Sequence, residues 1–237
     1  MKAVILAGGE GTRLKGVIKD IPKPMALVGN KPFLEYLILQ LAKWQIKKII
    51  LSVGYKRDAI KSYFGSGKQW GVSIKYSEED TPLGTGGAIK NALTVIKDKQ
   101  FIVINGDSFL DINFDDFISF HNRKCARATI GLAFVNDTSR FGRVEINERN
   151  EITGFIEKGF GNSGFINGGI YLFNRDIFMD ISDGRISLEN NIIPAVVNKG
   201  LYGMLVKGFF VDIGIPQEYV SLCQNADRLQ DAVGSLC

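Results

Sequence analysis

The stretch Lys2-Ala-Val-Ile-Leu-Ala-Gly-Gly-Glu-Gly-Thr-Arg-Leu14, followed by Pro22-Lys23-Pro24-Met25, decides the fold. It begins with an apolar run, Ala3 to Ala7, which predicts a buried β-strand, and then breaks into a glycine-rich turn. Glycine permits positive φ angles and lets backbone N–H groups approach a ligand closely. Because the fixed cations Arg13 and Lys23 lie on the same stretch, it favours binding of a polyphosphate.

Two general nucleotide-binding motifs do not fit this turn. A P-loop requires Gly-Lys-Ser/Thr at its end, which is absent here, and the dinucleotide fingerprint G-x-G-x-x-G has Leu14 where its last glycine belongs. Gly8-Gly9-x-Gly11 alone is equally typical of a tight turn after a buried strand. Thr12-Arg13-Leu14 and Pro22-Lys23-Pro24 argue against that simpler interpretation.

The whole stretch resembles the signature of the sugar-1-phosphate nucleotidylyltransferases, the enzymes that make NDP-sugars. The resemblance covers residues 2 to about 225. It implies an enzyme in which a loop wraps a nucleoside triphosphate. Arg13 would hold the β- and γ-phosphates, and Lys23 would hold the α-phosphate and the incoming sugar phosphate, both as catalytic residues. The nucleotide-binding positions that it implies on this stretch are Leu6, Ala7, Gly8, Gly9, Gly11, Thr12, Arg13 and Lys23.

Composition limits the classes of protein and ligand. The chain has 237 residues, of which 45% are hydrophobic and 23% charged, enough for one well-packed domain. The net charge of +4 is mild and the basic residues are scattered, so we expect no nucleic-acid partner. Cys125, Cys223, Cys237 and the single histidine do not form a zinc-binding pattern. With neither a leader nor a long apolar span, we expect no membrane partner and a cytoplasmic protein.

The first half alternates apolar strands with helices. We expect strands at 47–53, 72–76 and 101–104, and helices at 31–44, 58–64 and 85–96. Continuous apolar strands of this kind indicate a parallel sheet covered on both faces. Ligands of such sheets bind beyond the carboxyl ends of the strands.

The second half is richer in strands. We expect strands at 128–135, 143–146, 152–156 and 165–173, a turn at 147–150, and helices at 188–198 and 216–230. The fold class is therefore α/β: a Rossmann-like, doubly wound, mostly parallel sheet with a mixed or antiparallel extension, which the resemblance identifies as GT-A-like. We expect one domain over 1–237, with a nucleotide-binding half at 1–111 and a sugar-binding half at 112–237.

Two aspartates are the candidate metal ligands. Asp107 follows the strand at 101–104, and Asp212 ends an apolar segment at 204–211. Two separate carboxylates can hold Mg²⁺, which usually takes one or two carboxylates together with phosphates. They resemble the metal-binding aspartates of the family, except that Phe210 replaces the usual Trp. A sugar phosphate is ionised at pH 7, so its oxygen can attack the α-phosphorus in line without a general base, and positioned cations stabilise the transition state.

The segment Glu78-Glu79-Asp80-Thr81-Pro82-Leu83-Gly84-Thr85-Gly86-Gly87 resembles the family's base-reading segment. This resemblance implies nucleotide binding for Glu79, Pro82 and Gly84, and the family resemblance of the Gly106-Asp107 step implies it for Asp107 as well. Glu79 stands where thymidylyl- and uridylyltransferases carry Gln. Because a carboxylate only accepts hydrogen bonds, it favours guanine, which offers two adjacent N–H donors. An acidic loop that caps the helix at 85–96 is nearly as probable an interpretation for Glu78 and Asp80.

Three segments of the second half resemble the family's sugar-binding steps: Phe141-Gly142-Arg143-Val144, Ile156-Glu157-Lys158 and Asn167-Gly168-Gly169-Ile170-Tyr171. Gly142, Glu157, Asn167 and Gly168 are the implied sugar-binding positions, and Lys158 would bind the phosphate. Gly159 replaces the usual Pro, which changes the expected shape of that loop. A simple surface charge pair is the alternative for Glu157 and Lys158.

Among short members of the family, the pattern looks most like the glycero-manno-heptose 1-phosphate guanylyltransferases. Their GDP-heptose product feeds capsule, S-layer or lipopolysaccharide glycans. The alternatives are transfer to mannose, glucose or N-acetylmuramate 1-phosphate from UTP or dTTP, a non-catalytic regulatory subunit of the same fold, and a nicotinamide dehydrogenase. The dehydrogenase would need an acid after the second strand, where Val53-Gly54-Tyr55 stands. A homodimer is a family-level expectation.

Overall fold

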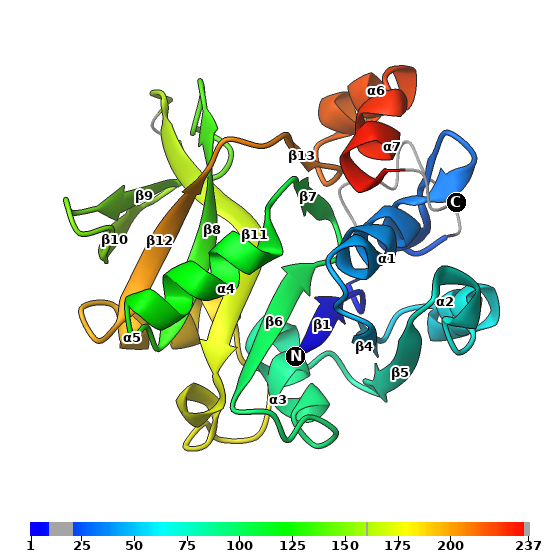
Figure 1. Cartoon of the computed structure of the whole chain (residues 1–237), viewed down its shortest axis with the longest axis horizontal. Coiled ribbons are helices and arrows are strands. Elements are labelled where there is room, and N and C mark those ends of the chain that lie inside the picture. Colours follow the sequence, from blue (N-terminus) through cyan, green and yellow to red (C-terminus); the bar gives the residue numbers. More distant parts are fainter. Residues whose placement is uncertain (10–20, 160, 235–237) are drawn as a thin grey trace.

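A seven-stranded sheet runs through the molecule in the order β12-β8-β11-β6-β1-β4-β5 (Figure 1). This computed structural model describes residues 1–9, 21–159 and 161–234. β1 (Lys2–Leu6) lies between β4 (Lys48–Val53) and β6 (Gln100–Asn105), and β5 (Ser73–Glu78) extends the parallel array beyond β4. The predicted parallel core is confirmed, and its strands are apolar because both faces are covered.

The second half extends this sheet in a mixed arrangement, as expected. β11 (Gly164–Asn174) is antiparallel to β6 and to β8 (Ala128–Val135), and β12 (Leu201–Val206) is parallel to β8. β9 (Arg143–Ile146) and β10 (Ile152–Ile156) form a separate antiparallel hairpin. The turn between them has Asn150 at a φ of 64°, a conformation that Asn tolerates better than most residues.

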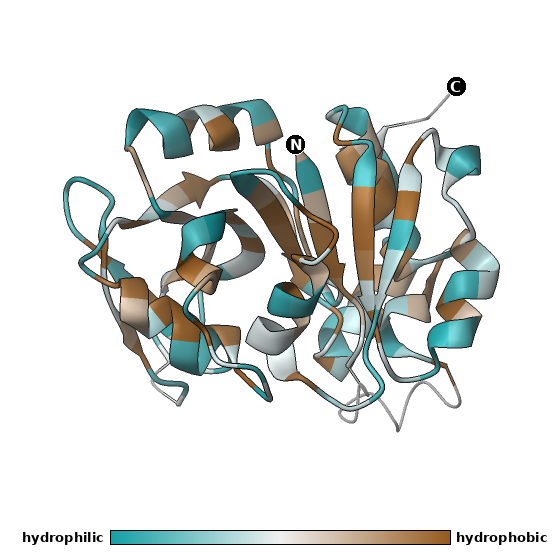
Figure 2. Ribbon diagram, turned by 90° about the horizontal axis from the view of Figure 1, so that it is seen from below, coloured by the Kyte–Doolittle hydropathy of each residue, from teal (hydrophilic) through white to brown (hydrophobic). Residues whose placement is uncertain are grey.

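Helices cover both faces of the sheet, which makes the fold doubly wound. α1 (Phe33–Lys43), α2 (Arg57–Phe64), α4 (Phe114–Arg123), α6 (Pro216–Gln224) and α7 (Asp227–Val233) contribute to the core on one face. α3 (Gly84–Ala92) and α5 (Ile193–Val196) contribute to the core on the other. The alternation of β1 decides this division, since Ala3 and Ile5 belong to the first core and Val4 to the second. Figure 2 shows apolar strands flanked by helices with hydrophilic outer stretches.

Several helix boundaries differ from the prediction. α1 begins at Phe33 because Lys31–Pro32 form the short strand β3, which pairs with β2 (Leu27–Val28). The helix expected over 216–230 is two helices, since Asn225 leaves the helical region with φ −128° and ψ 42°. This break lets α7 pack on α1 (Figure 1).

The second half holds a helix that the sequence analysis missed. α4 has buried Phe114, Phe117 and His121 at i, i+3 and i+7, and the Asn113 side chain accepts a hydrogen bond from the Asp116 N–H at 3.1 Å. This N-cap and this period were readable signals. The expected helix over 188–198 is shorter than predicted, with a π-helical turn at Leu188–Ile192 leading into α5. Among the described residues, no helix has the length and apolar character needed to cross a membrane.

His121 is fully buried between α4 and the sheet. Its Nδ1 lies 2.8 Å from Thr129 Oγ1 and its Nε2 lies 3.2 Å from Asn174 Oδ1. Burial lowers the pKa of His121 below its usual 6.5, with the Asn174 hydrogen bond opposing the shift. The unfolded chain therefore takes up a proton at this histidine before the folded protein does.

We accordingly expect the free energy of unfolding to fall as the pH is lowered below 6.5. Urea denaturation of the wild type and of His121→Gln between about pH 7.5 and pH 5 measures this effect. The variant should lose part of the pH dependence, because its amide does not titrate. Equal slopes in both proteins would contradict the assignment.

Candidate active site

The described part of the glycine turn lies where three parallel strands end. Ala7 N–H donates to Ser52 O at 2.8 Å, and Gly106 N–H donates to Leu6 O at 3.0 Å, so the turn is joined to the ends of β4 and β6. A Cβ at Gly106 would overlap Leu6 O, which requires glycine at this close approach. Ala7 is fully buried and packs beneath the turn. Gly11, Thr12 and Arg13 lie outside the described residues.

A cavity of about 1340 Å³ opens at this edge of the sheet. It joins the first half of the chain to the second. The predicted site residues that line it are Leu6, Gly8, Gly9, Lys23, Glu79, Pro82, Gly84, Asp107, Gly142, Glu157, Lys158, Asn167 and Asp212. Residues that are far apart in the sequence thus share one opening, as the resemblance implied.

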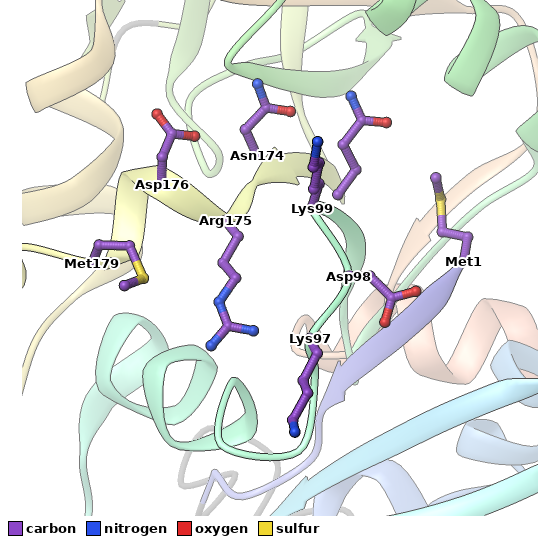
Figure 3. A pocket seen from close by; sticks show the side chains of 9 residues that line it. Met1, Lys97, Asp98, Lys99, Asn174, Arg175, Asp176 and Met179 are labelled. Atoms are coloured by element: carbon purple, nitrogen blue, oxygen red, sulfur yellow. The ribbon is translucent and has the colours of Figure 1, made fainter.

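A second hollow lies at the opposite end of the sheet, beside the amino ends of β1 and β6. Figure 3 shows Met1, Lys97 and Arg175 around it. Its acids are engaged elsewhere, since Asp98 pairs with Lys2 at 2.8 Å and Asp176 pairs with Arg127 at 2.9 Å. No predicted site residue that the structure describes lies there, so the cavity at the carboxyl ends is the candidate site.

The Lys23 side chain lies close to both candidate metal ligands, Asp107 and Asp212. Its Nζ lies 2.6 Å from Asp107 Oδ2 and 3.9 Å from Asp212 Oδ1. Pro22 and Pro24 restrict the backbone on either side of it at the start of a 3₁₀ turn, Lys23–Met25. Only 13% of the lysine side chain is exposed, so its charge is directed towards the carboxylates and the cavity.

Antiparallel pairing of two short strands brings these aspartates together. β7 (Ser108–Leu110) pairs with β13 (Phe210–Asp212), so that Asp212 lies opposite Ser108. Ile213 N–H donates to Asp107 O at 2.9 Å and extends the pairing. The apolar segment predicted at 204–211 is therefore broken into β12 and β13, and the second of these places Asp212.

The residues around Asp212 explain its local motif. Gly214 N–H donates to Asp212 Oδ1 at 2.6 Å, and a Cβ at Gly214 would overlap Lys23 Nζ. Phe210, which replaces the usual Trp, packs edge-on against Phe141 with ring centroids 5.7 Å apart. The smaller ring therefore still supports the wall of the cavity beside Gly142.

Glu79 is held at the wall next to the glycine turn. Its Oε1 accepts a hydrogen bond from Ser52 Oγ at 3.0 Å, and its Oε2 accepts one from Leu83 N–H at 3.0 Å. A Cβ at Gly8 would lie 3.0 Å from Glu79 Oε1, so the turn and the carboxylate are in close contact. Each carboxylate oxygen therefore keeps one lone pair that can accept a further hydrogen bond. Both lone pairs belong to a side chain that the Ser52 and Leu83 hydrogen bonds hold in place.

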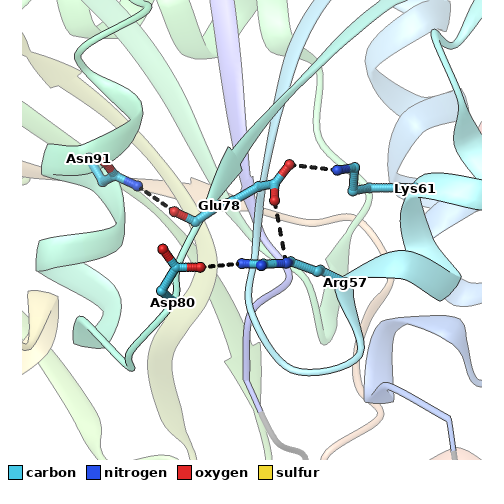
Figure 4. Close-up of polar contacts among 5 residues, drawn as sticks. All are labelled: Arg57, Lys61, Glu78, Asp80 and Asn91. Carbon is cyan, nitrogen blue, oxygen red and sulfur yellow. Dashed lines mark hydrogen bonds and ion pairs between the residues drawn. The ribbon is translucent and has the colours of Figure 1, made fainter.

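The flanking acids face α2 (Figure 4). Arg57 bridges them, with Nε 3.3 Å from Glu78 Oε2 and Nη1 2.7 Å from Asp80 Oδ1, and Lys61 Nζ lies 2.6 Å from Glu78 Oε1. The hydrogen bond from Lys61 lowers the pKa of Glu78. In extended chain, alternate side chains point to opposite sides, so the Glu79 side chain is directed away from those of Glu78 and Asp80 and towards Ser52. Glu78 and Asp80 therefore pair with α2 rather than capping α3.

The second wall comes from the hairpin and the loop after β10. Gly142 has a φ of 78°, and a Cβ there would lie 2.8 Å from Ile156 O. Glu157 and Lys158 line the cavity with exposed side chains, and in the described ranges no ion pair joins them. Gly159 has a φ of 110° and its N–H donates to Ser139 O at 2.8 Å, neither of which proline permits.

A buried polar group orients Asn167. Its Nδ2 donates to the Tyr171 hydroxyl at 2.8 Å, and its Oδ1 accepts from Gly169 N–H at 3.0 Å. The Asn105 side chain also hydrogen-bonds to Tyr171, and burial raises the pKa of that tyrosine above its usual 10.0. Gly168 does not line the cavity and instead packs against Leu110, where a Cβ would lie 2.6 Å from Leu110 Cδ2.

Several lining residues were missed from the sequence. The loop after β4 and the end of β6 contribute some, and a segment before α5 contributes others. They include Tyr55, Arg57, Asn105, Ser187, Glu189 and Asn190. Asn105 carried a readable signal because it directly follows an apolar parallel strand. The segment before α5 carried no such signal, since only tertiary packing brings it against α3.

Comparison with known proteins identifies the family. The nucleotidyl transferase family profile matches residues 2–228, nearly the whole chain. The chain is a nucleotidyl transferase. The resemblance found in the sequence is thereby confirmed, and the dehydrogenase alternative is excluded.

The curated relatives of this nucleotidyl transferase include two D-glycero-α-D-manno-heptose 1-phosphate guanylyltransferases. That of Campylobacter jejuni is 43% identical over 92% of this chain and 97% of its own length. That of Aneurinibacillus thermoaerophilus is 39% identical over 92% of this chain and 95% of its own length. Both relatives are therefore matched over nearly their whole length.

Solved structures agree with this nucleotidyl transferase in fold. The crystal structure of HddC from Yersinia pseudotuberculosis superimposes with a TM-score of 0.86 at 36% identity, covering 95% of this chain and 99% of that one. A second crystal structure of HddC, complexed with GMP-PN, gives a TM-score of 0.85 over the same coverage. The predicted fold class is confirmed by these superpositions.

Proposed function

We propose that this nucleotidyl transferase moves a guanylyl group from GTP to D-glycero-α-D-manno-heptose 1-phosphate and releases pyrophosphate. The observation that carries the proposal is the fixed Glu79 carboxylate in the cavity that also contains Lys23, Asp107 and Asp212. The two heptose 1-phosphate guanylyltransferases that match 92% of this chain support the choice of sugar.

The reaction is a single in-line displacement. An oxygen of the sugar 1-phosphate forms a bond to the α-phosphorus of GTP while the bond from that phosphorus to the pyrophosphate oxygen breaks. The nucleophile is already ionised at neutral pH, so it has no proton to lose, and the leaving pyrophosphate carries away the negative charge. Positioning and charge stabilisation are then the main tasks of the protein.

Lys23 supplies a positioned cation for this step. Its Nζ lies at the cavity wall between Asp107 and Asp212. We assign it to the α-phosphate and to the incoming sugar phosphate, where charge accumulates as the new bond forms. Arg13 is proposed to bind the β- and γ-phosphates from the glycine turn, on the strength of the sequence alone.

Asp107 and Asp212 fit a magnesium ion. Their carboxylates both approach Lys23 Nζ, at 2.6 Å and 3.9 Å, which supports a shared cationic position beside them. In the part of the chain that the structure describes, no cluster of three or more His, Cys, Asp or Glu is found. Two carboxylates with phosphate oxygens are nonetheless the usual ligands of Mg²⁺. When bound, the ion would neutralise phosphate charge and orient the triphosphate.

Glu79 is the proposed base-reading residue. Ser52 and Leu83 take one lone pair of each carboxylate oxygen, and the remaining lone pairs can accept from guanine N1–H and N2–H. Uracil and thymine present one N–H flanked by acceptors and would place a carbonyl oxygen against the carboxylate. The bases of UTP and dTTP are therefore disfavoured.

On the sugar side, Gly142, Glu157 and Asn167 are the proposed contacts to hydroxyl groups, and Lys158 is the proposed contact to the sugar phosphate. Gly168 is assigned to packing beneath Asn167. Lys207, Gly208 and Phe209 connect β12, the edge strand of the large sheet, to β13, which ends at Asp212. We also propose a cytoplasmic location and a homodimer.

The experiment that tests the proposal is a pyrophosphate-release screen of ATP, GTP, CTP, UTP and dTTP against heptose, mannose, glucose and N-acetylmuramate 1-phosphates. We expect the highest kcat/KM for GTP with the heptose phosphate. Preference for UTP or dTTP would contradict the assignment of the base, and preference for another sugar would contradict the heptose assignment. Absence of pyrophosphate release with every pair would favour a regulatory subunit.

Glu79→Gln is expected to reduce the preference for GTP over UTP and dTTP by about tenfold or more, because the amide offers one donor and one acceptor in place of two acceptors. The kcat/KM ratios for the three nucleotides measure this change. Glu78→Gln is the matched control, since its carboxylate faces Arg57 and Lys61. Unchanged selectivity in Glu79→Gln would remove Glu79 as the base reader.

A further inference from the structure

The segment of residues 183–190, called the strap below, lies across the amino-terminal end of α3. Ile186 N–H donates to Leu83 O at 2.8 Å, and Gly86 N–H donates to Ile186 O at 2.8 Å. Farther along α3, Lys90 Nζ lies 2.6 Å from Asp183 Oδ1. The strap comes from the second half of the chain and is held against the first half.

The glycines of the base-reading segment allow the backbone of the strap to approach closely, because they have no Cβ. Gly84 has a φ of 70°, and a Cβ there would clash with Ile186 O at 2.5 Å. A Cβ at Gly87 would lie 2.6 Å from Gly184 O, and Gly87 N–H already donates to Ile186 O at 3.2 Å. The amide groups of Gly86 and Gly87 at the start of α3 therefore donate to the backbone of the strap. The side chains of the strap are left to contact a ligand.

Glu189 is the carboxylate that the strap contributes to the cavity wall. Its Oε2 accepts hydrogen bonds from Thr85 Oγ1 at 2.9 Å and from Ser187 Oγ at 3.3 Å. Thr85 is itself oriented, because its Oγ1 accepts from Leu188 N–H at 2.8 Å. Within the described ranges, Glu189 Oε1 has no hydrogen bond, so one oxygen of an oriented carboxylate is left to a ligand.

Glu189 belongs to the second half of the chain, which also supplies the cavity residues Gly142, Glu157 and Asn167 that are assigned to the sugar. Burial raises the pKa of Tyr171, and the negative charge of Glu189 raises it further. Asn167 Nδ2 donates to the same tyrosine hydroxyl at 2.8 Å. Glu189 and Asn167 thus both act on Tyr171 from the cavity wall, on the side assigned to the sugar.

We propose that Glu189 is a sugar-specificity residue, whose free carboxylate oxygen accepts hydrogen bonds from hydroxyl groups of the sugar 1-phosphate. This role rests on the proposed function, because it requires a polyhydroxylated phosphate ester in the cavity. A carboxylate suits such a ligand because it accepts from adjacent hydroxyls with charge-assisted bonds.

The test compares Glu189→Ala with the wild type in the steady-state reaction. We expect the KM for the sugar 1-phosphate to rise about tenfold to a hundredfold, as for loss of a hydrogen bond to a charged group. The KM for GTP should stay within about twofold, because Glu79 is untouched. Glu189→Gln should fall between the two proteins, since its amide keeps an acceptor for Thr85 but lacks the charge.

Asp183→Ala is the matched control. Asp183 is the other acid of the strap, its side chain is 97% exposed, and it does not line the cavity. If it raises the sugar KM as much as Glu189→Ala does, or if Glu189→Ala raises both substrate KM values equally, the direct role of Glu189 is overturned. The comparison uses the substrate pair that the wild type turns over best. A wild type that prefers UTP therefore contradicts guanylyl transfer and not Glu189.

Discussion

Lys23→Ala is expected to lower kcat for pyrophosphate release about 10²–10³-fold, the loss typical of a positioned electrostatic group. Lys23 Nζ lies 2.6 Å from Asp107 Oδ2 at the cavity wall, and only 13% of the side chain is exposed. Its removal takes away the cation assigned to the α-phosphate and leaves two carboxylates facing the triphosphate. Initial rates at saturating GTP and sugar 1-phosphate measure the effect.

The variant should remain folded, because the two acids that pair with Lys23 are partly exposed and can be solvated when its charge is removed. Thermal unfolding checks this point. Lys31→Ala is the matched control, since Lys31 belongs to a nearby short strand and pairs with Glu35 at 3.7 Å outside the cavity. A folded Lys23→Ala protein with full activity would contradict the proposed mechanism.

Asp107→Asn should lower the rate by a similar factor of about 10²–10³. The substitution preserves shape but removes the charge that pairs with Lys23 and that would hold Mg²⁺ together with Asp212. We also expect the concentration of Mg²⁺ that gives half-maximal activity to rise, because one anionic ligand is lost. Rates over a titration of MgCl₂ measure both effects.

Binding of Mn²⁺ in the presence of GTP, followed by electron paramagnetic resonance, gives a readout that does not depend on turnover. Asp111→Asn is the matched control, because Asp111 follows β7 outside the cavity. If Asp107→Asn binds Mn²⁺ as the wild type does and loses only rate, Asp107 positions Lys23 rather than a metal. Wild-type rates and wild-type binding together would remove Asp107 from the site.

The parallel core was predictable because its signals are local. A strand buried on both faces must be apolar throughout, so the segments of β1, β4 and β6 stand out in the sequence. Helix limits were less predictable. Asn225 divides α6 from α7 because docking on α1 favours a bend, which no local pattern of residues 216–230 indicates.

The residues of the candidate site also differ in whether a local motif or only the tertiary structure identifies them. Glu79 was found because it belongs to a recognisable segment after a strand, and the structure places it at the cavity wall. Glu189 was not found, since its segment contacts α3 only through tertiary packing. Gly168 was assigned to the sugar from its motif, but it packs against Leu110 beneath the cavity.

The sequence by itself determined the family, the parallel core and thirteen of the residues that line the cavity, because glycines, prolines and charges at the ends of apolar strands have few other uses. Only the tertiary structure decided how the halves meet. The β7–β13 pairing joins Asp107 to Asp212, and the strap brings Glu189 to α3. These contacts link residues about a hundred positions apart, and their free energy comes from burial and hydrogen bonding that exist only once the sheet has formed.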